Sequence, residues 1–133
     1  MPSEQPVAYN GGAAFGRDGK GIWFVSDRDS EFQRLRYFEL ATGKETVFTA
    51  DTPWDVNGLA VSRDGRWLAW TVNEDGIEKV AVRDLRSGKP AKLAALPVGV
   101  LGGFGFSWDS KRLAVTVSSA RTAGDVFVYD LPS

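Results

Sequence analysis

Histidine and cysteine are both absent from this 133-residue sequence. Without histidine the chain cannot assemble a Ser-His-Asp or Cys-His catalytic group, and it offers no imidazole to a metal ion. Without cysteine it has neither a disulfide framework nor a thiolate metal site, which fits a reducing compartment. We therefore expect a chain that is not an enzyme by itself and that binds no cofactor or metal.

A strong charge of either sign is lacking as well. The 16 basic and 17 acidic side chains leave a formal net charge of −1. The basic residues form no block or stripe, so we expect no nucleic-acid partner. Apolar runs are much shorter than the roughly 18 residues that a membrane-spanning helix needs, so we expect no membrane span. The first six residues lack the basic and apolar regions of a secretion signal, which favours a cytoplasmic location.

Three copies of a turn motif are present instead. The copies are Phe15-Gly16-Arg17-Asp18-Gly19-Lys20, Val61-Ser62-Arg63-Asp64-Gly65-Arg66 and Phe106-Ser107-Trp108-Asp109-Ser110-Lys111. Their aspartates are 46 and 45 residues apart, and a second ladder, Glu39-Leu40, Asp84-Leu85 and Asp130-Leu131, repeats with steps of 45 and 46. A fixed period of this length indicates a repeat protein, in which each unit buries its faces against its neighbours.

Each repeat is predicted to contain four antiparallel strands. Apolar residues two apart predict second strands over 22–26, 68–72 and 113–117, and hairpin turns lead into fourth strands over 46–49 and 92–96. No segment has a sustained 3.6-residue period, so the fold class is all-β. Four strands in about 45 residues are typical of a β-propeller blade. We predict a partial propeller, with blade 1 over about 11–50, blade 2 over about 57–96 and an incomplete blade 3 over about 103–133.

The repeat assigns structural roles to most of the noticeable residues. When the three repeats are aligned, equivalent apolar positions predict the side chains that pack between blades: Phe24, Trp70, Tyr37, Val82 and Val128. The turn residues, which we expect to be structural, are Asp18, Gly19, Asp64, Gly65 and Asp109. Trp54 lies in a crossover at one mouth of the ring and is the candidate for contacting a peptide or partner, although packing is its favoured role.

Three further groups of residues resemble functional sites, and a structural role is the preferred interpretation of each. Asp27-Arg28-Asp29-Ser30 begins like a calcium loop but lacks the later ligands. Glu74-Asp75 and Asp64 have nothing to separate their pKa values as an acid–base pair would need. The glycine-rich segment 99–103 precedes a strand and not a helix, so it is no phosphate loop.

The blade motif also resembles that of a known family. The residues that carry the resemblance are Asp18-Gly19-Lys20, Ser26-Asp27-Arg28-Asp29 and Leu40-Ala41-Thr42-Gly43-Lys44, with Asp64-Gly65-Arg66 and Asp84-Leu85-Arg86-Ser87-Gly88-Lys89 in the second unit. This pattern is similar to the propeller repeats of the prolyl oligopeptidase family of serine peptidases and of TolB-type proteins. In that family the propeller is non-catalytic and restricts access to a separate α/β-hydrolase domain. The chain has no Gly-x-Ser-x-Gly elbow, so no catalytic residue is transferred to it.

The resemblance implies a non-catalytic, substrate-gating propeller segment; the alternative is a stand-alone TolB-like protein-binding scaffold. Complete propellers use about 4–8 blades, so an arc of three exposes two blade faces and unpaired strand edges. We expect a second copy to cover them in a head-to-tail dimer with six blades, or a missing hydrolase domain to be the partner. Peptides are a further expected partner.

Overall fold

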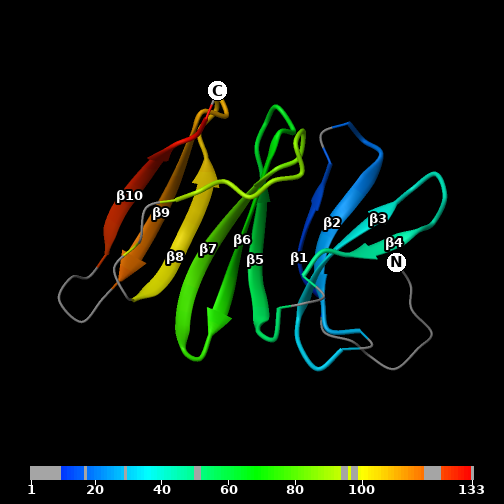
Figure 1. The fold of residues 1–133 in the computed structure, drawn as a ribbon, viewed down its shortest axis with the longest axis horizontal. Coiled ribbons are helices and arrows are strands. Elements are labelled where there is room, and N and C mark those ends of the chain that lie inside the picture. Colours follow the sequence, from blue (N-terminus) through cyan, green and yellow to red (C-terminus); the bar gives the residue numbers. More distant parts are fainter. Residues whose placement is uncertain are drawn as a thin grey trace.

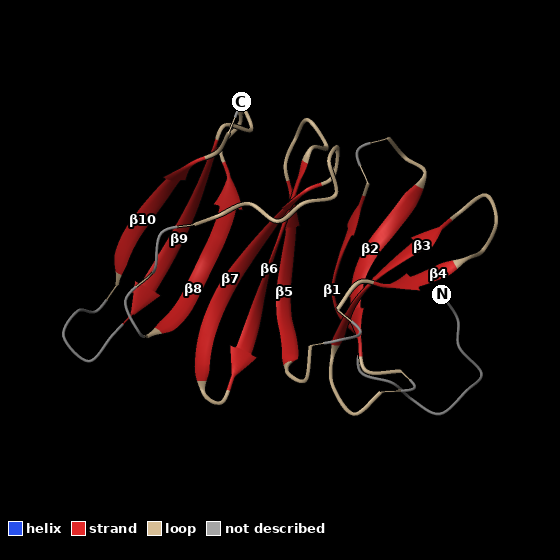
Figure 2. Cartoon of the chain, in the orientation of Figure 1, coloured by secondary structure: helices blue, strands red, loops and turns tan. Residues whose placement is uncertain are grey.

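The computed structural model describes residues 10–16, 18–28, 30–49, 52–93, 96, 99–118 and 124–132. In these ranges the chain forms ten β-strands and no helix (Figure 2). The first sheet contains β1 (Asn10–Phe15), β2 (Gly21–Ser26), β3 (Arg34–Glu39) and β4 (Glu45–Val47). The second contains β5 (Asp55–Val61), β6 (Trp67–Glu74) and β7 (Ile77–Asp84), and the third β8 (Val100–Phe106), β9 (Arg112–Ser118) and β10 (Asp125–Asp130).

The three sheets stand side by side in sequence order (Figure 1). Within each sheet the strands are antiparallel, and each strand pairs with the one that follows it in the chain. Each sheet corresponds to one predicted repeat, and we call it a blade from here on. β5 and β8 begin slightly before the predicted blade bounds, at Asp55 and Val100.

The expected fourth strand of blade 2, over residues 92–96, is not formed in the part of it that the structure describes. A single bridge joins Arg83 to Pro90, and the Ala91 N–H donates to the Val82 carbonyl at 2.8 Å. Beyond this point the chain leaves the sheet, and Leu93 and Leu96 pack against the apolar cluster between blades 2 and 3. These partly buried leucines therefore contact the apolar cluster and do not extend the predicted ladder.

A bulge interrupts the first strand of every blade at the same place. The register with the second strand shifts between Asn10 and Ala13 in β1, between Val56 and Gly58 in β5, and between Leu101 and Phe104 in β8. A bulge bends its strand and increases the local twist. Its repetition shows that the three blades share one backbone design.

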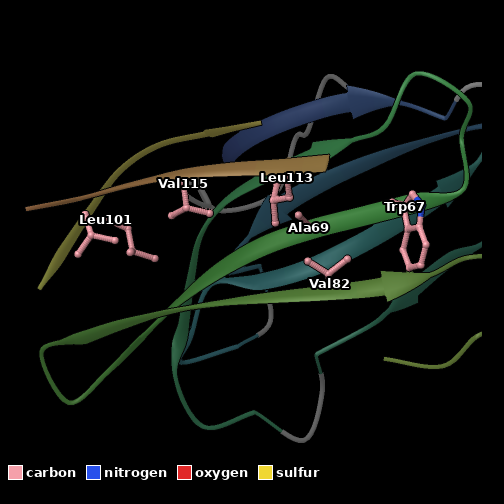
Figure 3. Close-up of a cluster of buried hydrophobic side chains, with 7 residues drawn as sticks. Trp67, Ala69, Val82, Leu101, Leu113 and Val115 are labelled. Atoms are coloured by element: carbon pink, nitrogen blue, oxygen red, sulfur yellow. The ribbon is translucent and has the colours of Figure 1, made fainter. Parts of the chain in front are cut away.

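Two apolar clusters lie between the blades. Because side chains alternate along a strand, each blade has a front face toward the blade that follows and a back face toward the blade before it. The buried residues between blades 1 and 2 are Trp23, Val25 and Leu35 from the front of blade 1, and Val56, Leu68 and Trp70 from the back of blade 2. Those between blades 2 and 3 are Trp67, Ala69 and Val82 from blade 2, and Leu101, Leu113, Val115 and Val117 from blade 3 (Figure 3). Full burial of a Val or Leu side chain stabilises the folded state by about 1.5–3 kcal/mol, so these two interfaces form the hydrophobic core.

The residues predicted to pack between blades divide into two groups. Trp70 is buried in the first cluster with Tyr37 packed against it, and Val82 is buried in the second. Phe24 is buried but belongs to neither cluster, because its neighbours Trp23 and Val25 face blade 2 and it therefore points to the back of blade 1. Val128 is 58% exposed on the front of blade 3. Packing between the blades of one chain is therefore not found for Phe24 and Val128.

Candidate functional site

Three similar turns lie at one end of the blades, each between the first and second strands of a blade (Figure 1). In each turn the aspartate Oδ1 accepts the backbone N–H two residues later: Asp18 from Lys20 at 2.9 Å, Asp64 from Arg66 at 2.9 Å, and Asp109 from Lys111 at 3.0 Å. The next residue has a positive φ: 71° at Gly19, 78° at Gly65 and 62° at Ser110. The predicted turn residues therefore all sit in these turns and shape them.

A serine reinforces the turns of blades 2 and 3. The Ser62 hydroxyl donates to Asp64 Oδ1 at 2.6 Å and accepts the Trp67 N–H at 2.9 Å. The hydroxyl of Ser107 makes the equivalent bonds to Asp109 and Arg112, at 2.6 and 3.0 Å. Blade 1 has Gly16 at this position and therefore no hydroxyl.

These hydrogen bonds favour the ionised form of two turn carboxylates, Asp64 and Asp109. The Ser107 hydroxyl, followed by the Lys111 N–H, lowers the pKa of Asp109 below its ordinary value. At Asp64, burial acts to raise the pKa, but the bonds from Ser62 and the Arg66 N–H, together with the nearby charge of Arg86, outweigh it and lower the pKa. Both side chains are therefore acceptors at neutral pH and not proton donors.

Two contacts join the turns of blades 2 and 3. Ser110 is 4% exposed, and its Oγ accepts the Asp64 N–H at 3.0 Å. The guanidinium of Arg63 lies over the ring of the exposed Trp108, 3.4 Å from the ring centroid. The turn end of these blades is thus held together by one hydrogen bond and one cation–π contact.

A cleft of roughly 590 Å³ opens between blades 1 and 2 at the same end. Blade 1 lines it with Gly16, Asp18, Trp23, Tyr37 and Phe48, and blade 2 with Val61, Asp64, Gly65, Leu85 and Arg86. The Trp23 ring centroid lies 4.6 Å from that of Tyr37 and 4.6 Å from that of Phe48. The cleft therefore combines an aromatic wall with two carboxylates and one guanidinium.

Close packing fixes Tyr37 in this wall. A Cβ at Gly21 would lie 2.2 Å from Tyr37 Cζ, so the ring can lie over the strand only because residue 21 is glycine. Burial, with the negative charges of Asp18 and Glu39, raises the pKa of Tyr37. The phenol therefore keeps its proton at neutral pH, and it can both donate and accept a hydrogen bond.

Arg83 adds a cation beside the wall. Its guanidinium carbon lies 5.4 Å from the Phe48 ring centroid and 5.8 Å from that of Trp70. Its Nε is buried and makes no hydrogen bond within the part of the chain that the structure describes. The arginine thus contacts two aromatic faces between the two blades.

Trp54, the predicted contact residue, lies away from the cleft. It is half-buried in the loop just before β5, at the opposite end of the blade from the turns, and it does not line the cleft. The loop is anchored next to it, because Asp55 Oδ1 accepts the Gln33 N–H at 2.8 Å and the Val56 N–H donates to the Gln33 carbonyl at 2.9 Å.

The structure also places residues of two other groups that resembled functional sites in the sequence. The Ser30 N–H donates to the Asp27 carbonyl at 3.0 Å, while Asp29 lies outside the described residues. Glu74 pairs with Lys79 at 3.1 Å, at the end of β6 opposite to Asp64. Among the described residues no three potential metal ligands gather, and no helix could cross a membrane.

Sequence reasoning did not predict that these residues form a cleft. Trp23, Phe48 and Arg86 were not singled out, although Trp23 stands two residues from Val25 on one strand face. Both aspartates of the cleft were predicted, but only as turn residues.

Comparison with known proteins rests on the fold. No family model and no curated protein matches the sequence. TolB from Acinetobacter baumannii is 20% identical, with a TM-score of 0.73 over 92% of this chain and 30% of that chain. The tricorn protease is 20% identical, with a TM-score of 0.64 over 94% of this chain and 13% of that one.

The β-propeller domain of the trilobed protease from Pyrococcus furiosus is 14% identical, with a TM-score of 0.68 over 93% of this chain and 39% of that chain. The chain is a partial β-propeller. The all-β blade architecture predicted from the repeat is therefore confirmed, and the chain spans less than half the length of each of these three structures.

Proposed function

We propose that this chain is a non-catalytic propeller segment that binds polypeptide in the cleft between blades 1 and 2. The observation that carries the proposal is the composition of the cleft. Its aromatic wall of Tyr37 and Phe48, packed on the buried Trp23, offers an apolar surface, and its rim offers both signs of charge through Asp18, Asp64 and Arg86. An apolar surface with a few placed polar groups is the common pattern of a binding site.

The sequence supports a role without catalysis, because a chain without histidine and cysteine cannot supply the usual nucleophile–base pairs of a peptidase. Within this proposal the first reading is a substrate-gating segment of a larger serine peptidase, like the propellers of the prolyl oligopeptidase family that the repeat resembles. The second is a stand-alone TolB-like scaffold, and the similarity of the fold to that of TolB supports this alternative. A reading frame that continues into a hydrolase domain with a Gly-x-Ser-x-Gly elbow supports the first, and one without it supports the second.

Two matched pairs of variants test the cleft. Asp18 and Asp109 hold the same turn position and accept the same backbone bond, but only Asp18 lines the cleft. Arg86 and Lys89 lie in one hairpin turn, and only Arg86 lines the cleft. Asp18→Asn and Arg86→Ala therefore alter the site, while Asp109→Asn and Lys89→Ala are their controls.

The probe is a positional-scanning library of fluorescein-labelled hexapeptides, read by fluorescence anisotropy. We expect a defined subset to bind, and we expect the two cleft variants to shift the charge preference at one peptide position by about two- to fivefold, as an exposed ion pair would. The two controls should bind as the unaltered chain does. Equal binding by cleft and control variants, or no binding by any hexapeptide, would show the proposal to be wrong.

A further inference from the structure

The outer edge of blade 1 is closed by a fourth strand. β4 continues the sheet beyond β3, and the residues of β3 that bond to it alternate along the strand. Leu35, near the start of β3, uses both of its backbone groups on this side. Its carbonyl accepts the Phe48 N–H at 2.8 Å, and its N–H donates to Thr49 Oγ1 at 3.0 Å. The outward backbone groups of Leu35 are therefore satisfied by the segment that follows β3.

The equivalent edge of blade 2 is closed only at one end of β7. There the Val82 carbonyl accepts the Ala91 N–H at 2.8 Å, so the backbone groups of Val82 point away from β6. Val80 lies two residues earlier and is the equivalent of Leu35, 45 residues later in the sequence, so its N–H and carbonyl point to the same outer edge. No residue of the described chain bonds to either group from the outer side.

The open stretch of β7 covers residues 77–81. The register of β7 with β6 is regular, so Glu78 points outward with its backbone groups as Val80 does. Leu93 would stand opposite Val80, three residues from the Arg83–Pro90 bridge on both strands. Instead the chain beyond the hairpin crosses toward blade 3 (Figure 1), and Leu93 packs against the apolar cluster between blades 2 and 3. Donors and acceptors therefore alternate along an edge that the described chain leaves open.

The charged side chains of this stretch do not guard the edge. Natural edge strands are protected by charged side chains, by bulges or by a covering segment. Here Glu78 reaches blade 3, where its Oε2 accepts the Leu101 N–H at 2.8 Å. Lys79 pairs with Glu74 of β6 at 3.1 Å, but its side chain is 59% exposed, so the ammonium can bind a second carboxylate. The strand also has no bulge against β6.

We propose that the outer edge of β7, over residues 77–81, binds an extended segment of another polypeptide as a fourth strand. A strand is the occupant because blade 1 holds one in the same place, and because it continues the ladder that the Arg83–Pro90 bridge begins. The added strand runs antiparallel to β7, as β4 runs to β3. Its residue opposite Lys79 is acidic, because opposite charges across a ladder attract. None of these residues lines the cleft, so this proposal does not depend on binding there.

Two N-methylated peptides test the backbone bonds without altering the protein. The parent probe is a fluorescein-labelled peptide, Thr-Val-Phe-Glu-Val-Thr, which copies residues 46–48 and continues with a glutamate to face Lys79. N-methylation of its phenylalanine removes the N–H that corresponds to that of Phe48 and donates to Val80. N-methylation of the valine before it removes an N–H that points away from β7. In fluorescence anisotropy the first should weaken binding about fivefold or more, and the second should not.

Hydrogen exchange and a charge swap locate the bound peptide. By NMR the Val80 amide should exchange rapidly in the free chain and slowly with the parent peptide, whereas that of Ala81, which faces β6, should be slow in both. Lys79→Glu should weaken binding of the parent peptide about two- to fivefold, and a peptide with lysine in place of the glutamate should recover it. Lys89→Glu, in the hairpin turn after β7, is the control and should bind as the unaltered chain does.

Four results would overturn the proposal. The first two are equal binding of the two methylated peptides and no binding of the parent peptide. A Val80 amide that exchanges slowly in the free chain at every concentration would show that the chain covers its own edge. Protection that appears without peptide, and only at high protein concentration, would show that a second copy occupies the edge. Either of these last results contradicts a separate polypeptide as the occupant.

Discussion

Ser110 occupies a backbone conformation that the equivalent turns give to glycine. Its φ of 62° is left-handed, as are those of Gly19 and Gly65. For a residue with a Cβ this conformation costs about 1 kcal/mol. In return, Ser110 Oγ accepts the N–H of Asp64 at 3.0 Å in a buried position and joins the turns of two blades. We predict that the hydrogen bond and the strain offset one another.

Two substitutions separate these effects. Ser110→Ala keeps the strain and removes the acceptor, so it should lower the free energy of unfolding by about 1 kcal/mol. Ser110→Gly removes the same acceptor but also relieves the strain, so it should lie within about 0.5 kcal/mol of the unaltered chain. Gly19→Ala is the control for strain alone, because φ is 71° there and a Cβ would meet nothing within 4 Å. It should cost about 1 kcal/mol.

Urea unfolding followed by tryptophan fluorescence measures these differences, since Trp67 is buried between blades 2 and 3. With an m-value of about 2 kcal/mol/M, a change of 1 kcal/mol moves the midpoint by about 0.5 M. All chains must be compared at one concentration, so that any association contributes equally to the measured stabilities. Equal losses for Ser110→Gly and Ser110→Ala would refute the strain argument, and an unaltered midpoint for Ser110→Ala would refute the contribution of the bond.

Three further outcomes are expected. Leu113→Ala removes a fully buried side chain between blades 2 and 3 and should cost about 2–5 kcal/mol in urea unfolding, whereas Val126→Ala, on an exposed face, should cost much less. Hydrogen bonds lower the pKa values of Asp64 and Asp109 in the folded chain, so these two carboxylates stabilise the fold above the unfolded pKa of about 3.9. This stabilisation is lost as pH falls through the lower folded pKa values. An Asp64→Asn chain whose urea midpoint falls between pH 5 and pH 2.5 as steeply as that of the unaltered chain would contradict this. Gly21→Ala would place a Cβ 2.6 Å from the Phe38 carbonyl oxygen, so its thermal midpoint should fall by several degrees, and a midpoint equal to that of the unaltered chain would show that the tight approach is not needed.

The sequence by itself determined the features that depend on near neighbours. The turns follow from Asp18, Asp64 and Asp109, because an aspartate bonds a backbone N–H only two residues away and the information lies within the motif. The period of about 45 residues and the two-residue alternation of apolar side chains predicted the blades and their strands, apart from the fourth strand expected over residues 92–96. These are local or periodic properties, so they can be read without knowing which blade stands next to which.

Only the tertiary structure decided which of the repeated positions are covered. Leu35 and Val126 hold the same place in the repeat, yet one is fully buried and the other is 65% exposed, because burial depends on the neighbouring blade and not on the residue. The bond between Ser110 and Asp64 spans 46 residues, and the cleft takes half its lining from each of two blades. Contacts of this kind come from the distance and angle between blades, and a repeat that encodes each blade separately does not specify them.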